Sequence, residues 1–273
     1  MRRATSVAAC AALSISACVL GFRGKAAFTA DHDLSGVEEV EITLPDTPID
    51  ILGCTAVEDD PEACPELLSY RGVWSSLGGT SNKAESNAAE PTVQLVREGG
   101  LAALSTVVPL SIAGLVDLEM GTMTMPGDRD VQVYGGVGDV SVDGMLSTVT
   151  VVVDVGDVEV RGANDGLAVN TEHGNILVFT GGHADLRTQW GSVDVEQLGG
   201  ARDLFVETEN GDITVTLTDD ADVSFTIRAP GTIRIDTRQV TAVTDGSFER
   251  TLGTGSVSIE LTTDAGGVVV RGS

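Results

Sequence analysis

The chain has 273 residues and a formal net charge of −25, with 16 lysine and arginine residues against 41 aspartate and glutamate residues. This length suffices for one large or two small domains with a hydrophobic core. The acidity excludes a nucleic-acid-binding surface, which needs clustered cations, and it disfavours attraction to an anionic membrane through basic patches. The 33 glycines and 4% aromatic residues fit an all-β chain with many tight turns.

The first residues have the pattern of an export signal. Two arginines precede an apolar run over residues 7–15, which is too short to span a bilayer. The following "ISAC", ending at Cys18, resembles a bacterial lipobox, in which the cysteine is lipidated and becomes the mature N-terminus. We therefore expect residues 1–17 to be a lipoprotein signal peptide. The protein would be anchored by lipid at the outer membrane or cell surface rather than free in the periplasm. A second motif ending at Cys10, or a plain signal peptide cut elsewhere, remains an alternative.

Two cysteines remain in the mature chain, Cys54 and Cys64, on either side of a short polar loop. An even remainder of this kind predicts a disulfide in an oxidising compartment. A disulfide that closes such a loop would stabilise the fold by roughly 2–3 kcal/mol, because it restricts the conformations of the unfolded chain. A zinc site is the weaker alternative, because the nearest histidine in sequence is His32 and no second pair of ligands follows.

Residues 18–35 are expected to form a tether, and residues 36–126 an irregular region of strands that contains the disulfide. "VEITLPDTPIDILG" predicts two short strands around a turn with proline, and "PTVQLV" predicts a third. "LAALSTVVPLSIAGL" favours strand or loop over helix, because of its Thr-Val-Val-Pro centre and flanking glycine. The small polar residues of "SSLGGTSNKAESNAAEP" are typical of an exposed loop or linker.

Residues 127–273 contain a repeat. Each unit has a glycine, a small polar residue and then β-branched apolar residues two and four positions after the glycine; successive glycines are 18, 18, 17, 20, 20 and 24 residues apart. The turn glycines are Gly138, Gly156, Gly174, Gly191, Gly211, Gly231 and Gly255. A second alternating strand precedes the glycines, so each unit of about 18–20 residues holds two short strands. Stacked coils with parallel ladders bury the inner face that one unit cannot bury alone. This predicts an all-β fold, a β-solenoid of six or seven coils about 30 Å long.

We expect each glycine to turn a corner with positive φ, and the polar residue after it to hydrogen-bond its own backbone. Only three of those seven polar residues are aspartates: Asp139, Asp157 and Asp212. This argues against a calcium β-roll, in which each coil supplies several carboxylates. No metal or other cofactor is expected, although an isolated calcium site in the acidic "TDDAD" stays open.

The "GDVxV"-type turns, the preceding "LxVxTxxG" of "LFVETENGDITV" and "LAVNTEHGNILV", and the closing "VSIELTTDAGGVVVRG" resemble the bacterial "putative adhesin" domain family. That family is a β-solenoid domain without a known biochemical activity. The resemblance covers about residues 127–273 and reaches upstream strands such as "VEITLPDTPIDILG". It implies a surface interaction and designates no binding residue. The disulfide loop and the enlarged "TRQVTAVTDGSFERTLGTG" depart from the family pattern.

No catalytic motif appears in the sequence. There is no G-x-S-x-G elbow, H-E-x-x-H pair or phosphate-binding glycine loop. Carboxylate pairs such as Asp194 and Glu196 are expected on a solvated face. The arginines are scattered, whereas a polysaccharide lyase would cluster them with carboxylates. We therefore expect a protein that is not an enzyme.

His173 and Trp190 each precede a turn glycine in consecutive repeats, which predicts that they are neighbours at one corner. They are a candidate platform for a sugar or a partner side chain; the alternative is that they pack against a loop. The expected function is structural or adhesive, with an unknown protein or polysaccharide partner and no nucleic acid. A periplasmic scaffold or signalling partner is the first alternative, and a carbohydrate-active β-helix enzyme is a distant one.

Overall fold

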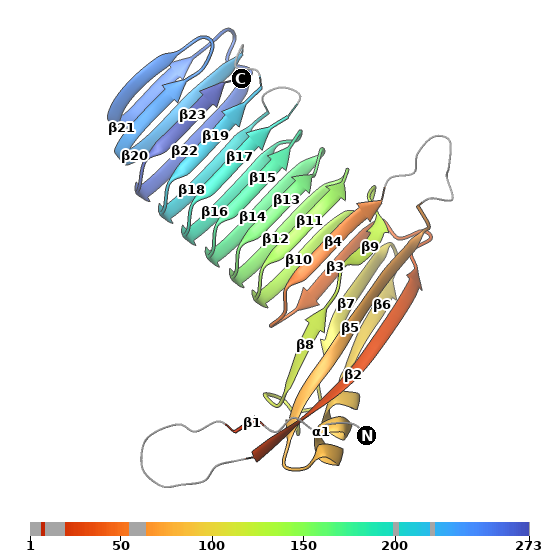
Figure 1. The fold of residues 1–273 in the computed structure, drawn as a ribbon. Helices are drawn as coiled ribbons and strands as arrows, with labels where there is room; N and C mark the ends of the chain where they lie inside the picture. Colours follow the sequence, from red (N-terminus) through yellow and green to blue (C-terminus); the bar gives the residue numbers. More distant parts are fainter. Residues whose placement is uncertain (1–6, 9–19, 55–63, 199–201, 219–221, 273) are drawn as a thin grey trace, which may run out of the picture.

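The computed structural model describes residues 7–8, 20–54, 64–198, 202–218 and 222–272. It is a rod of stacked two-strand coils that stands on a smaller antiparallel sheet (Figure 1). This confirms the expected all-β solenoid with parallel ladders.

Each coil contributes one strand to each of two parallel ladders. The first ladder runs in the spatial order β7 (Leu101–Val107), β3 (Glu39–Leu44), β10 (Asp130–Val137), β12 (Thr148–Val155), β14 (Gly166–His173), β16 (Ala184–Trp190), β18 (Leu204–Asn210), β22 (Val257–Ala265) and β20 (Val223–Asp236). The second runs β9 (Met123–Pro126), β4 (Ile49–Cys54), β11 (Val140–Met145), β13 (Val158–Gly162), β15 (Ile176–Thr180), β17 (Val193–Gln197), β19 (Ile213–Leu217), β23 (Val268–Gly272) and again β20.

The ladders extend upstream of residue 127, where the sequence pattern placed the start of the solenoid. The coil of β3 and β4 stacks on β10 and β11, and the pair β7 and β9 lies beyond it. The described residues therefore form nine coils, counting β20 as the last, and at about 4.8 Å a step the stack is about 38 Å long.

The far end of the rod departs from chain order. The coil of β22 and β23 inserts between the coil of β18 and β19 and the long strand β20, which bends to join both ladders. Strand β21 (Thr241–Thr251) then pairs antiparallel with β20. This hairpin covers the last edge of the ladders, which would otherwise expose unpaired backbone groups.

That insertion corrects one predicted corner. Gly255 precedes β22, a strand of the first ladder in which Ile259 pairs with Leu204, so it does not sit between the two strands of a coil. The corner glycine of this coil is Gly266. The 24-residue spacing arises because β21 intervenes in the chain, and it is no repeat period.

The inner face is a set of apolar columns. One column runs through Val131, Val149, Leu167, Ala184, Leu204 and Ile259, which pair in register and are all buried. Because side chains alternate across each strand, every second residue joins such a column while its neighbours face solvent. The period-two pattern of the sequence is therefore the core pattern of the rod.

Positive φ does not explain the whole glycine column. Gly138, Gly156 and Gly191 have φ of 147°, 156° and 153°, whereas Gly174 and Gly211 lie outside that positive range. The expectation that every corner needs positive φ is therefore wrong.

Close approach of successive coils is what these corners share. A Cβ atom placed on Gly174 would lie 1.9 Å from the carbonyl oxygen of Gly156, one on Gly191 would lie 2.0 Å from that of Gly174, and one on Gly211 would lie 1.9 Å from that of Gly191. No side chain fits at such distances, so the stacking itself requires glycine.

The polar residues after the glycines also act between coils. The Oδ1 atom of Asp139 accepts the backbone N–H of Asp157 at 2.9 Å, and Oδ1 of Asp157 accepts that of Asn175 at 2.7 Å. Oδ1 of Asp212 accepts the N–H of Gly267 at 2.7 Å. The expected local turns are thus replaced by bonds that tie each corner to the next coil.

Buried threonines add a third bond at the corners. Thr188 and Thr208 donate their hydroxyl hydrogens to the carbonyl oxygens of Gly174 and Gly191, at 3.1 Å and 3.0 Å. Thr171 stands in the same column, and its buried hydroxyl has no hydrogen-bond partner. The corner therefore benefits from a threonine in some coils only.

Residues 20–33 are a strand and not the expected tether. Strand β2 (Leu20–Asp33) pairs antiparallel with β5 (Leu67–Gly78), which in turn pairs with β8 (Val116–Met120). Apolar residues such as Phe22, Phe28 and Ala30 alternate with polar ones along β2. This period-two pattern is the signal that the sequence analysis missed. Strand β6 (Thr92–Glu98) pairs with β7, and β1 (Val7–Ala8) with β2.

The expected polar loop contains a helix, α1 (Ser81–Ala89). Thr80 caps it by accepting the N–H of Lys83 at 3.2 Å, and Ala84, Asn87 and Ala88 form its buried face. The helical spacing of these small residues behind a capping threonine is the sequence pattern that indicates the helix.

Strand β4, earlier in the chain, ends at the predicted disulfide. Cys54 and Cys64 are bonded, with Cα atoms 5.6 Å apart.

Replacing Gly211 by alanine should destabilise the rod by about 3 kcal/mol, because the new Cβ would force the backbones of two coils apart. Gly79→Ala is the matched control, since a Cβ there meets no atom within 4 Å. Thermal unfolding of both variants checks this. Equal melting temperatures would show that close approach does not constrain the corner.

Thr171→Val should stabilise the protein by about 1 kcal/mol, because it removes a buried hydroxyl without a partner. The preceding coil already has Val153 at this position. Thr208→Val should instead cost about 1 kcal/mol by removing the bond to Gly191. Denaturant unfolding measures both changes, and the same sign for the two variants would contradict the assignment.

Candidate functional site

A line of exposed side chains runs along one corner of the rod. Val137 pairs with Val155, Val155 with His173, and His173 with Trp190, so these residues occupy one column on four consecutive coils. Val137, Val155 and Trp190 are 55%, 43% and 54% exposed, and His173 is exposed too. We call these four residues the corner ridge. Clusters of exposed apolar side chains are less common than single ones and point to an interaction surface.

His173 and Trp190 stack on each other within the ridge. Their ring centroids are 6.3 Å apart and the ring planes differ by 4°. Because parallel strands in register place equivalent residues directly above one another, the two rings share an orientation. More than half of the Trp190 surface remains open to solvent. The alternative that a loop covers this tryptophan does not fit that exposure.

Polar groups border the ridge on both sides. The residues before it include Asp154 and Glu172, and the corner residues after the glycines include Asp139 and Asp157. All four are exposed, although Asp139 and Asp157 each use one carboxylate oxygen to accept a backbone N–H from the next coil. An aromatic and apolar strip between hydrogen-bond acceptors can hold a ligand with both an apolar face and donor groups.

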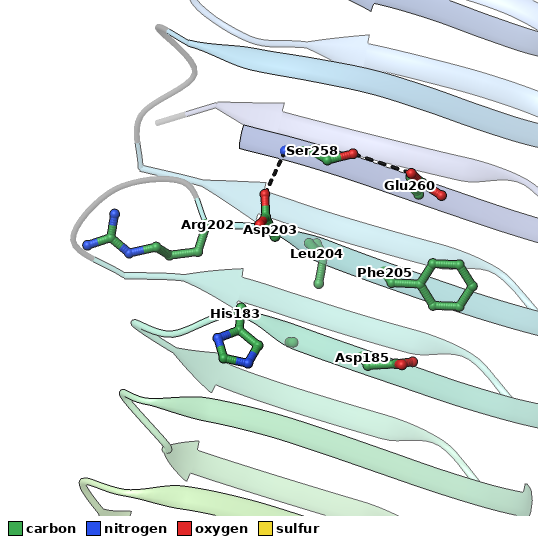
Figure 2. Close-up of a pocket in the computed structure, with 9 residues that line it drawn as sticks. His183, Asp185, Arg202, Asp203, Leu204, Phe205, Ser258 and Glu260 are labelled. Atoms are coloured by element: carbon green, nitrogen blue, oxygen red, sulfur yellow. Dashed lines mark hydrogen bonds between the residues drawn. The ribbon is translucent and has the colours of Figure 1, made fainter. Parts of the chain in front are cut away.

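An open groove of about 620 Å³ lies on the outer face of β16, β18 and β22, where the sequence analysis placed no site. Figure 2 shows His183, Asp185, Arg202, Asp203, Phe205 and Glu260 around it. The sequence feature that could have indicated this groove is the longer repeat between Gly191 and Gly211, which has 20 residues against 17 in the repeat before it.

The carboxylates of this groove already have partners. Asp185 forms an ion pair with Arg187 at 3.0 Å, and Oδ1 of Asp203 accepts the N–H of Ser258 at 2.8 Å. Glu260 accepts the Ser258 hydroxyl at 3.4 Å. The Asp203 bond joins the start of β18 to β22, whereas the Asp185 and Glu260 contacts lie within β16 and β22. In the part of the chain that is described, none of the three carboxylates faces another one in a hydrogen-bonded acid pair.

The three histidines lie in separate places. His32 on β2 hydrogen-bonds the Tyr70 hydroxyl at 2.9 Å and stacks on its ring, and burial raises the pKa of that tyrosine. His173 belongs to the corner ridge, and His183 lines the groove. The structure therefore does not bring them together. Asp194 and Glu196 lie on the outer face of β17, where Asp194 is exposed and Glu196 is half-buried.

A smaller cavity of about 210 Å³ lies where the solenoid meets the antiparallel sheet, lined by Thr47, Trp74 and Leu118 among others. The buried Nε1 of Trp74 has no hydrogen-bond partner there. The volume is below that of usual ligand pockets and suits a few water molecules.

Over the described ranges, no group of three or more histidine, cysteine, aspartate or glutamate side chains is arranged to hold a metal ion. The same ranges contain no helix that is long and apolar enough to cross a membrane. Cys18 and most of the acidic "TDDAD" lie outside the described residues.

Replacing Trp190 by serine should change the free energy of unfolding by about 1 kcal/mol or less, since the side chain is exposed and loses only its stack on His173. Trp74→Ser is the contrast, because Trp74 is buried and its loss should cost about 3 kcal/mol or more. Chemical denaturation measures both. A similar cost for the two variants would mean that the ridge is structural packing.

Comparison with solved structures finds two similar chains. One is described as a putative cell adhesion protein from Clostridium sporogenes, with 11% identity, a TM-score of 0.33, and coverage of 91% of this chain and 100% of that one. The other is described as a putative adhesin from Bacteroides fragilis, with 12% identity, a TM-score of 0.45, and coverage of 91% and 97%. None of the curated proteins matches.

The family comparison gives the stronger result. The match covers residues 36–271, which include both the strands β3 and β4 and the coils that carry the corner ridge. It confirms the resemblance seen in the turn motifs, including its expected reach upstream to "VEITLPDTPIDILG". The chain belongs to the Toastrack DUF4097 family.

Proposed function

We propose that this protein is exported, carries a lipid on Cys18 and displays its solenoid at the cell envelope as a non-enzymatic structural or adhesive rod. The corner ridge is its contact surface. The observation that supports this is the run of four exposed side chains on consecutive coils, with the stacked pair of His173 and Trp190.

The chemistry of the ridge favours a carbohydrate ligand. Sugar rings have an apolar face that packs on an aromatic ring and hydroxyl groups that donate to carboxylates. The ridge repeats every coil at about 4.8 Å, so an extended chain can lie along several coils at once. An anionic polymer fits poorly, because the chain has a net charge of −25.

Lipid attachment at Cys18 is the second part of the proposal, and the lipobox-like "ISAC" supports it. Cleavage before Cys18 would remove β1, which pairs with β2 through two residues only. The mature chain would then begin two residues before β2. An anchor on Cys18 would then lie next to the start of β2, at the end of the molecule opposite the C-terminus (Figure 1).

Cys18→Ser should abolish labelling of the protein by a radioactive fatty acid and release it in soluble form. Cell fractionation and labelling of the two forms side by side check this. A native protein that is found soluble, or a variant that remains labelled, would contradict the anchor.

Binding at the ridge can be followed through tryptophan, since the chain has only Trp74 and Trp190 and the first is buried. Soluble cell-wall polysaccharide fragments should shift the emission of the native protein, and the shift should be lost in Trp190→Phe. Val243→Ser, at an exposed position on β21 outside the ridge, is the control that should bind normally.

If no polysaccharide shifts the emission, the carbohydrate assignment is wrong. Retention of a single envelope protein by the native chain and not by Trp190→Phe would then favour the periplasmic scaffold or signalling role.

A further inference from the structure

Exposed apolar side chains gather at the end of the molecule opposite the C-terminus. Leu110 is 95% exposed, in the turn of residues 108–115 between β7 and β8. Leu77, Val107 and Leu115 are exposed beside this turn, and the backbone N–H of Leu77 donates to the carbonyl oxygen of Leu115 at 2.9 Å. We call these four residues the apolar tip.

The start of the mature chain meets the apolar tip. Arg23 on β2 pairs directly with Leu77. Helix α1 packs on the same strand so closely that a Cβ on Gly24 would lie 2.3 Å from the backbone of Ala84. Figure 1 shows α1 and the start of β2 together at this end. These elements carry three exposed cations: Arg23 beside Leu77, Lys25 two residues further along β2, and Lys83 on α1. They include both lysines of the chain.

This end does not share the acidity of the rod. Residues 20–27, 74–92 and 107–117 carry these three cations and three carboxylates, Glu85, Glu90 and Asp117, so their net charge is zero against −25 for the whole chain. At physiological salt, charges are screened over about 8 Å. An anionic surface placed against the tip would therefore be little affected by the far coils of the rod; the nearest corner carboxylate is Asp46, which lines one cavity with Val108, Ala113 and Gly114 of the turn.

We infer that the apolar tip docks on a lipid bilayer, with Leu110 in the interface and the nearby cations at the phosphate groups of the lipids. The inference rests on the proposed lipid at Cys18. Only Val19 lies between Cys18 and Leu20, so their Cα atoms are at most about 7 Å apart. A lipid there holds this end, and no other part of the rod, against the membrane.

The side-chain chemistry fits that surface. Leucine side chains gain free energy in the acyl region, while lysine and arginine reach the headgroups with their long stems. The tip thus gives the anchored molecule a fixed orientation. The rod then projects from the bilayer, so that His173 and Trp190, the members of the corner ridge farthest from the tip, are held clear of it.

Docking can be measured separately from lipidation in cells. The full chain with Cys10→Ser is coupled through Cys18 to a maleimide lipid in vesicles of phosphatidylethanolamine and phosphatidylglycerol. Hydrogen exchange is then compared with that of the same chain blocked by N-ethylmaleimide. Amides of residues 108–115 should exchange about tenfold more slowly on vesicles, the factor for burial of one leucine side chain. Those of β21, at the far end, should be unchanged.

Leu110→Asp should restore the exchange rates of the free chain, and it should fold normally because Leu110 is almost fully exposed. Val243→Asp, at a 71% exposed position on β21, should leave the protection intact. Equal exchange of residues 108–115 on vesicles and in solution would overturn docking and leave the anchor standing. Absence of lipid on Cys18 in cells would overturn the anchor, while the coupled chain still reports on docking.

Discussion

The approach of one corner glycine to the carbonyl oxygen of the glycine below it is the constraint on which the rest of the structure depends. At Gly174, Gly191 and Gly211 the space for a Cβ atom is already filled by that oxygen, at 1.9–2.0 Å. These coils can therefore stack in register only with glycine at the corner, whereas the coil of β3 and β4 turns through residues 45–48 without one. The aspartate and threonine bonds at the same corners then fix the register from one coil to the next.

Strict register between coils aligns equivalent side chains on the surface. Since every coil repeats the path of the previous one, a residue before the glycine lies directly above its equivalent, and isolated side chains become a line. The corner ridge arises in this way from Val137, Val155, His173 and Trp190. A solenoid thus presents an extended contact surface along its length.

The two ends of the rod serve different needs. At the far end, β20 and β21 cover a ladder edge that would otherwise pair with other chains. At the near end, β2 pairs with β5 and places Arg23 beside Leu77 of the apolar tip, while Leu110 is exposed in the turn between β7 and β8. The acidic coils lie between these ends and keep the rod soluble.

The sequence by itself determined the repeat, the two strands of each coil, the inner columns, the disulfide of Cys54 and Cys64 and the adjacency of His173 and Trp190, because these depend on local period and spacing. It did not determine why the glycines are needed, or that residues 20–33 form a strand. It also did not determine which coil stacks on the coil of β18 and β19. Those features depend on contacts between segments far apart in the chain. The insertion of β22 and β23 before β20 separates stacking order from chain order, and only the tertiary structure shows that Gly266, and not Gly255, completes the glycine column.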